Sequence, residues 1–352
     1  MLNRDQSQDL GDRATAIQAG GSVTVNNVGL NYADVRSICE DVFRANFYKL
    51  AGNAKEVAHN RMEEVNEAFL KKLQKENPKG LGIAEDPDFQ YALFSVQKEY
   101  ARSGDKDLGD LLVDLLVDRS KHGSRDILQI VLNESLTTAS KLTNEQLATL
   151  SVIFSIKYAQ INGIANHDHF GAELDKYVLP FASQLTRNLT CYQHLQFCGC
   201  GSLQQIAGKS LEEILCIRYQ GLFSKGFCAS EVSNSFRSIG EDGPFFIPCL
   251  NDAKRLQVDA MRKEDLKSIM DKNALTQEER TKLHQLFDLN MMSNTEIIER
   301  VTSIRPYMGD IFEIWRDSSL KSLTLTSVGI AIGHANIKRQ IGEFADLSIW
   351  IN

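Results

Sequence analysis

The chain has 352 residues, of which 43% are hydrophobic and 24% are charged, a balance that is typical of globular proteins and excludes disorder throughout. The formal net charge of −7 argues against a general DNA- or RNA-coating role, because backbone binding needs concentrated lysine and arginine to displace counterions. Seven cysteines in irregular positions indicate a reducing cytoplasm rather than a disulfide framework, and no stretch has the length and apolar character of a membrane span.

Residues 1–30 are a polar leader in which Val23 and Val25 alternate with polar residues after Gly20-Gly21. This alternation predicts a small β-hairpin or a pair of β-arcs, which we call the N-terminal β arm. Two isolated strands are marginal in water, so the arm would gain most by pairing its edges with the same segment of another subunit. A flexible leader that orders only weakly is the alternative.

Residues 31–80 carry the clearest pattern in the chain. Apolar residues recur every three or four positions from Val35 to Leu73, with charge on the other face, which predicts a long amphipathic helix. Gly52-Asn53 could divide it, because glycine is a poor residue for a helix interior. Such a helix must pack its apolar stripe against other helices, either of this chain or of a second copy. Together with the strand edges of the arm, it predicts a homo-oligomer assembled through residues 14–75.

Residues 86–190 are predicted to form a helical bundle with short connections. The segment from Leu108 to Arg119 is apolar except at three aspartates, which predicts a central packing helix whose narrow acidic stripe meets solvent. Thr143 and Gln146 form a capping box that opens a further helix of this bundle.

Residues 191–352 are predicted to form a C-terminal α unit with a few short strands. Two short apolar runs around Asn251-Asp252 predict a β-hairpin. Near the end of the sequence, alternation over residues 323–325, a capped helix and renewed alternation over residues 347–351 predict the order strand, helix, strand. This ending is similar to the edge of a winged-helix domain, and the expected fold class is mainly α.

A cluster of cysteines is the first candidate for a metal site. Three thiols and an imidazole lie close together in the sequence, at Cys191, His194, Cys198 and Cys200. Zinc takes four such ligands, and Cys216 or Cys228 could contribute from outside the cluster. The single residue between Cys198 and Cys200 makes a tetrahedral site awkward, and buried free cysteines also behave as small hydrophobes. Both interpretations stay open.

Two further groups carry charge at short spacing. An acidic series could hold a divalent cation with help from another element, or could be a solvated helix face: Asp105, Asp107, Asp110, Asp114 and Asp118. The run Asn166-His167-Asp168-His169 offers adjacent titratable groups, but no nucleophilic residue lies at a recognisable spacing from them. An ordinary loop surface is the other interpretation of that run.

Gly208-Lys209-Ser210 is similar to the end of a phosphate-binding loop, but the earlier glycine of that motif is replaced by Leu203, and Ser210 is sufficiently explained as a helix cap. Lys338-Arg339, with Trp350, could form part of a basic face for nucleic acid, or could offset the dipole at a helix C-terminus. No serine-histidine-aspartate, zinc-protease or dinucleotide motif occurs. The sequence therefore identifies no catalytic residue and predicts no cofactor.

Several segments carry a family resemblance, namely AIQAGGSVTVNN, LNYADVRSICEDVFRANFYKLAGNAKEVAHNR, ARSGDKDLGDLLVDLLVDR, LNESLTTASKLTNEQLATLSVIF, YQGLFSKGF and LTLTSVGIAIGHAN with LSIWI. Over nearly the whole chain, they resemble a bacterial family of anti-phage and conflict-associated proteins. The middle helices and LTLTSVG are also similar to the abortive-infection alpha (Abi-alpha) proteins. The leader is similar to segments of bacterial conflict proteins that help assembly. The resemblance implies a cytoplasmic bacterial protein of phage defence and supplies no catalytic residues.

Three hypotheses for the function follow. The first is a non-enzymatic, self-assembling protein of anti-phage defence, with itself and a defence-system or phage protein as partners. The second is a nucleic-acid-binding regulator that uses the C-terminal unit. The third is a metal-dependent effector, nuclease-like in character, that uses the aspartate or cysteine-histidine clusters.

Overall fold

A computed structural model of the chain describes residues 30–46, 52–123, 125–160, 163–205, 208–235, 245–273 and 275–351. The predicted β arm precedes residue 30 and therefore lies outside the described residues.

The described chain is mainly helical, as predicted. Its α-helices are α1 (Tyr32–Asn46), α2 (Asn53–Glu76), α3 (Pro87–Ser103), α4 (Lys106–Arg119), α5 (Ile127–Ala139), α6 (Asn144–Ile153), α7 (His167–Tyr177), α8 (Leu179–Ala182), α9 (Leu189–Phe197), α10 (Leu211–Arg218), α11 (Ala229–Ser235), α12 (Lys263–Lys272), α13 (Gln277–Asp288), α14 (Asn294–Ile304), α15 (Met308–Asp317) and α16 (Ser327–Ile341). A π-helical turn, η2 (Phe154–Tyr158), follows α6, and the 3-10 segments are η1 (Pro78–Glu85), η3 (Gln220–Phe223), η4 (Ser319–Lys321) and η5 (Leu347–Ile349). The strands are β1 (Gly201–Leu203), β2 (Phe246–Pro248), β3 (Leu256–Val258) and β4 (Leu323–Leu325).

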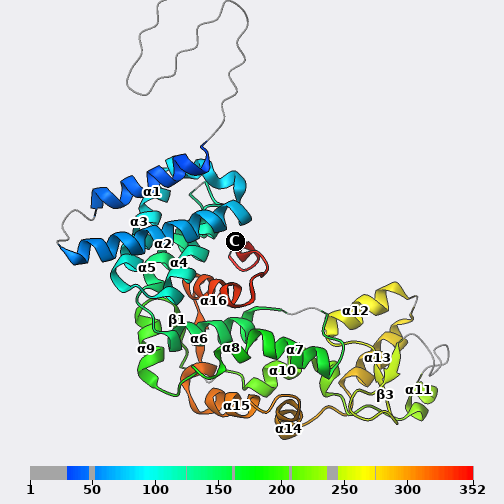
Figure 1. Ribbon diagram of the computed structural model, residues 1–352. Coiled ribbons are helices and arrows are strands. Elements are labelled where there is room, and N and C mark those ends of the chain that lie inside the picture. Colours follow the sequence, from blue (N-terminus) through cyan, green and yellow to red (C-terminus); the bar gives the residue numbers. More distant parts are fainter. Residues whose placement is uncertain are drawn as a thin grey trace, which may run out of the picture.

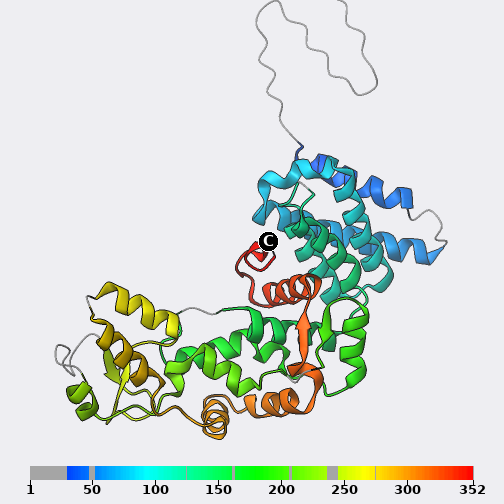
Figure 2. The ribbon, with the colours of Figure 1, turned by 180° about the vertical axis from the view of Figure 1, so that it is seen from behind.

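The helices form two arms that meet near α16 (Figure 1). Helices α1 to α5 make the first arm, and the second runs from α9 past α7 and α10 to α12 and α13 at its far end, as the view from behind also shows (Figure 2). One large hydrophobic core extends through the first arm and the near part of the second. A separate core includes Phe227, Phe246, Leu266 and Phe287. The far end is therefore an insertion between η3 and α14 with a core of its own.

The long helix predicted over residues 31–80 is divided into α1 and α2. Gly52, directly before α2, has a φ of 56°, a left-handed conformation through which an α-helix does not continue. Helix α1 packs against α2, and the rings of Phe43 and His59 lie 6.2 Å apart between their centres. The glycine thus acts as the divider that the sequence allowed.

Most of the described part of the apolar stripe is covered by the chain itself. Ala54 is exposed, whereas the other described residues of the stripe are buried, at Val35, Cys39, Phe43, Ala58, Met62, Val65, Phe69 and Leu73. They pack mainly against α3 and α4, which lie beside α2. The buried part of the stripe therefore needs no second copy to shield it, and assembly through residues 14–75 stays a prediction.

Helix α4 is the central packing helix that the sequence predicts, because its leucines and valines are buried around most of its circumference. Helix α16 returns from the far end of the sequence to pack against α4, α5 and α6. Two glycines allow this close approach: a methyl group at Gly329 would overlap the carbonyl oxygen of Cys200, and one at Gly333 would lie 2.9 Å from that of Leu150. The predicted bundle and the predicted C-terminal unit share one core at this helix.

The strands form two small antiparallel pairs. Strands β2 and β3 make the hairpin predicted around Asn251-Asp252, whereas β1 pairs with β4, far away in the sequence. The strand predicted over residues 347–351 is wrong, because the 3-10 turn η5 lies there. Asp346 caps that turn by accepting a hydrogen bond from the Ser348 backbone N–H at 2.9 Å. The ending therefore lacks the second strand of the winged-helix interpretation.

The π-helical turn η2 is held by hydrogen bonds to residues that come much later in the sequence. The Lys157 ammonium donates hydrogen bonds of 2.8–3.3 Å to three backbone carbonyls, of Leu320, Lys321 and Leu323. Burial lowers the pKa of Lys157 to about 8, and the three carbonyl oxygens favour its charged form. The indole N–H of Trp350 donates to the Tyr158 carbonyl at 3.1 Å.

Among the described residues, no helix is long and apolar enough to cross a membrane.

Candidate functional site

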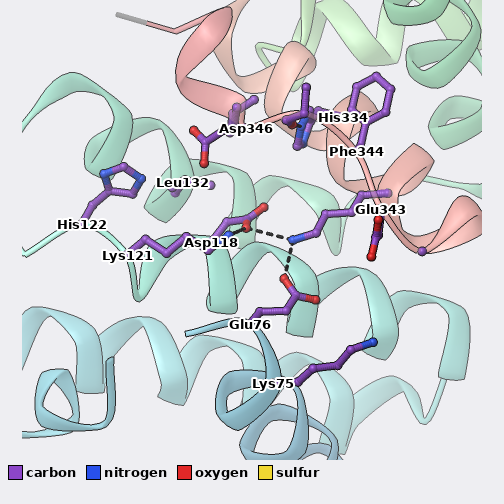
Figure 3. Close-up of a pocket in the computed structure, with 14 residues that line it drawn as sticks. Lys75, Glu76, Asp118, Lys121, His122, Leu132, His334, Glu343, Phe344 and Asp346 are labelled. Atoms are coloured by element: carbon purple, nitrogen blue, oxygen red, sulfur yellow. Dashed lines mark hydrogen bonds and ion pairs between the residues drawn. The ribbon is translucent and has the colours of Figure 1, made fainter. Parts of the chain in front are cut away.

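A polar cavity of about 340 Å³ lies where α2, α4 and α16 end (Figure 3). We call it the tail pocket, because the segment after α16 forms one of its walls. Its lining is Lys75, Glu76, Asp118, Lys121, His122, Leu132, His334, Lys338, Gly342, Glu343, Phe344, Ala345, Asp346 and Leu347. The pocket thus joins the N-terminal helices to residues 342–347.

Gly342 determines the path of that wall. Its φ of 85° is left-handed, which ends α16 and turns the chain back along it. Residues 343–347 then run beside α16, and their Ala345 carbonyl accepts a 2.6 Å hydrogen bond from His334 Nε2. Because α2, α4 and α16 all end at the pocket, the negative ends of their helix dipoles lie there.

Buried ion pairs form the floor of the pocket (Figure 3). Lys338 Nζ lies 2.7 Å from Glu76 Oε2 and 3.0 Å from Asp118 Oδ1, and Lys121 Nζ lies 2.6 Å from the same Asp118 oxygen. Burial alone would lower the pKa of Lys338, but Asp118 and Glu76 hold it above its ordinary value. Lys338 and Lys121 in turn hold the pKa of Asp118 below its ordinary value against the effect of burial. Lys338 and Asp118 are therefore both charged at neutral pH.

Asp114 extends this network one turn back along α4. Its carboxylate is fully buried and pairs with the ammonium of Lys72, with Lys338 3.9 Å away. Burial raises the pKa of Asp114, and Lys72 opposes that rise. The acidic stripe predicted to meet solvent is therefore internal at Asp114 and Asp118, and lysines rather than water neutralise it.

His334 places an unused polar atom deep in the wall of the pocket. The side chain is 2% exposed, and burial lowers its pKa, so the ring is neutral at neutral pH. Because Nε2 donates to Ala345, Nδ1 carries a lone pair, and it has no hydrogen-bond partner among the described residues. Phe344 and Phe154 pack against the edges and face of the ring at 5.2 and 5.9 Å between centres. His334 therefore leaves one buried acceptor atom unpaired beside the pocket.

The predicted cysteine-histidine cluster is only partly brought together. Cys198 Sγ lies 3.6 Å from His194 Nε2, whereas Cys191 and Cys200 are buried. Burial raises the pKa of each of these thiols, to about 12 for Cys200. Among the described residues, which include Cys216 and Cys228, no group of three or more histidine, cysteine or acidic side chains is arranged to hold a metal ion.

The remaining aspartates of the acidic series have separate roles. Asp105 caps α4 by accepting from the Leu108 backbone N–H at 3.2 Å, and Asp107 pairs with Arg339 at 2.6 Å. Asp110 is exposed on α4. The series thus divides between a cap, a surface pair and the floor of the tail pocket.

The histidine run opens a helix instead of forming a loop. Asn166 caps α7 by accepting from the His169 backbone N–H at 2.9 Å, and His167 Nε2 lies 3.1 Å from the Leu222 carbonyl oxygen. The Gly208-Lys209-Ser210 run likewise has a local role. Ser210 forms the predicted capping box with Glu213 at the start of α10.

The residues predicted for a basic face are already engaged. Lys338 lies on the floor of the tail pocket, and Arg339 bonds Asp107 and Asn336. Trp350 is half-buried, and its ring stacks on that of Phe344 at 5.7 Å between centres. The two cations and the indole thus hold the chain together and form no shared basic surface.

Sequence reasoning missed the pocket and its His334. A signal did exist: two aspartates four residues apart, in a helix that is otherwise apolar, must either meet solvent or find buried cations. The sequence does not identify the lysines that form ion pairs with these aspartates. His334, an imidazole within an apolar helix, was equally readable as a core residue.

The fold and the pocket define a mainly helical protein with a polar cavity closed on one side by its own C-terminal segment. The chain belongs to the family whose model, described as ":-like", matches residues 29–351. No match was found among curated proteins or solved structures. The functional conclusions below therefore depend on the residues of this chain.

Proposed function

We propose that the protein binds a small polar molecule in the tail pocket, and that its ligand-bound form acts on protein partners in a bacterial anti-phage defence system. The observation that carries this proposal is His334 Nδ1, a buried acceptor without a partner among the described residues, in the wall of a polar cavity. An unpaired buried polar atom costs free energy that a bound donor recovers. The sequence likeness to anti-phage and conflict-associated proteins supports the cytoplasmic, defensive setting.

The size and the lining of the cavity favour binding. A volume of about 340 Å³ is within the range of small-molecule sites. The described lining contains no serine, threonine, cysteine or tyrosine, so it lacks the common hydroxyl and thiol nucleophiles. A protein that senses a molecule, rather than one that transforms it through a covalent intermediate, is consistent with this set of side chains.

The pocket is also well placed to report its occupancy. Residues 343–347 form one wall, and they are connected through Trp350 and the Phe344 ring to the large core. A ligand that contacts both this wall and α2 would hold the C-terminal segment against the N-terminal helices. Ordering of this kind is a recognised way to couple a site to a distant surface.

Thermal unfolding in the presence of a panel of polar metabolites tests the proposal. A ligand present at 100 times its dissociation constant stabilises the folded chain by about 2.7 kcal/mol, which raises the melting temperature by several degrees. The increase should be lost in His334→Gln, whose amide can still donate to the Ala345 carbonyl but offers no lone pair at Nδ1. A panel that shifts neither protein, at millimolar concentration, would contradict the proposal.

Self-assembly is the second candidate function, and the exposed apolar residues of α9 favour it. Phe197 is 86% exposed and Leu189 is 52% exposed on the same helix. A second copy of the chain could cover both residues, in addition to any contact made by the leader. Light scattering should give a multiple of the chain mass for the full chain and a lower mass for Phe197→Ser or for a chain without residues 1–30. A monomer of unchanged mass in all three would exclude assembly.

A further inference from the structure

The electrostatic balance of the tail pocket is slightly negative. Four carboxylates and three lysines line it, and these seven side chains together carry a formal net charge of −1. The floor lysines, Lys121 and Lys338, already pair with Asp118 and Glu76 at 3.0 Å or less. Three helix C-termini add further negative partial charge. The charge in the pocket that is not part of an ion pair is therefore mostly negative.

Two carboxylates of the wall supply that charge. Glu343 forms no ion pair with any described residue, and it is exposed at the mouth of the pocket. Asp346 uses one oxygen to cap η5, and its pKa is lowered by the Ser348 hydrogen bonds and then by Lys121 and His122. Both carboxyl groups can accept hydrogen bonds from a ligand. Lys75, exposed on α2, pairs with no carboxylate of the described chain.

His334 adds an acceptor of a different kind. Its Nδ1 lone pair requires a donor, and a carboxylate brings none at neutral pH. An ammonium or a guanidinium brings three or more N–H groups. The half-buried Phe344 ring also lines the pocket, and aromatic rings favour a cation over an anion.

From this arrangement we infer that the ligand of the tail pocket is a small organic cation, an alkyl amine or guanidine, whose N–H groups meet His334 Nδ1 and the Glu343 and Asp346 carboxylates. The inference rests on the proposed binding function and names the class of its ligand. A chain of a few methylene groups between two polar ends fits a cavity of about 340 Å³.

Calorimetric titration of the full chain provides the test, with four probes: putrescine, agmatine, 1,4-butanediol and succinate. The diol has the carbon chain of putrescine without its charge, and succinate carries the opposite charge. We expect putrescine or agmatine to bind at least about tenfold more tightly than the diol, the factor that one lost charged contact of about 1.4 kcal/mol produces. Succinate should give no heat of binding.

The variant Glu343→Gln/Asp346→Asn identifies the site of binding. Both residues are exposed, and the amide oxygen introduced at position 346 can still accept the Ser348 hydrogen bond, so the fold should be retained and circular dichroism should match the parent. Cation affinity should fall by about tenfold or more, whereas Glu278→Gln, an exposed change in the far insertion, should leave it unchanged.

The possible outcomes separate the inference from the function on which it rests. Binding of succinate but of neither cation would overturn the cation inference and leave a ligand-binding pocket in place. Cation binding that survives the double variant would also overturn it, because the cation would then be held elsewhere. If no probe binds and the metabolite panel shifts no melting temperature, the proposed function itself is wrong.

Discussion

The ammonium of Lys338 and the carboxylate of Glu76, 262 positions apart in the sequence, lie 2.7 Å apart on the floor of the tail pocket. Their contact joins the end of α16 to the end of α2. Removal of one partner of a buried ion pair is strongly destabilising, because the other charge stays buried without compensation.

We therefore expect Lys338→Met to lower the free energy of unfolding by about 3 kcal/mol. Urea denaturation followed by circular dichroism measures the change. Lys75→Met is the matched control, since Lys75 lines the same pocket but is exposed, and its effect should stay within about 0.5 kcal/mol. Equal effects of the two substitutions would show that the ion pair has no special role.

Stability should depend on pH through His334. Burial holds its folded-state pKa below 6.5, so the unfolded chain binds a proton more readily than the folded chain between those two values. Stability is then lost as the pH falls from about 7 through 6.5, even with Asp118, Asp346 and Lys338 nearby. His167 is shifted in the same direction by burial. His334→Gln should therefore reduce the slope of unfolding free energy against pH, and an unchanged slope between pH 7 and pH 5 would refute this assignment.

Gly329→Ala should destabilise the protein by about 1–3 kcal/mol, the usual range for overpacking. The added methyl group meets the Cys200 backbone carbonyl, which cannot move without displacing β1. Gly82→Ala is the control, because a methyl group at Gly82 meets no atom within 4 Å. Melting temperatures of the two variants make the comparison, and a loss in both or in neither would count against the close approach of α16.

Trp350→Ala should release the wall of the tail pocket. The substitution removes the hydrogen bond to the Tyr158 carbonyl and the ring contacts with Phe344 and Phe154. Amide hydrogen exchange over residues 343–350 should become faster, while exchange in α3 stays as in the parent. Ile349→Ala is the control in the same segment, because Ile349 is 62% exposed. Faster exchange in that variant as well would mean that Trp350 does not anchor the segment.

Local signals in the sequence predicted local structure well. The capping boxes of Thr143 with Gln146 and of Ser210 with Glu213 are present, because both partners of each bond lie within one helical turn. The mainly helical class and the hairpin around Asn251-Asp252 are also confirmed, because both depend on residues that are close together in the sequence. Periodicity also identified most of the buried residues of α1 and α2, although Ala54 of the same stripe is exposed.

Long-range relationships could not be derived in this way. Periodicity shows that the stripe from Val35 to Leu73 is buried, but not whether this chain or another copy buries it. Alternation over residues 347–351 predicted a strand, yet a strand needs a partner edge, and the Asp346 cap favours a turn. The tail pocket depends on pairs such as Lys338 with Glu76, for which no spacing rule exists.

The position of α16 has a consequence for how the protein is made. Helices α4, α5 and α6 leave the ribosome long before residues 327–341, which complete their packing. Until then, the apolar surface that α16 will cover is exposed, and exposed apolar surface makes a partly synthesised chain prone to aggregation. Folding of the N-terminal half is therefore expected to finish late.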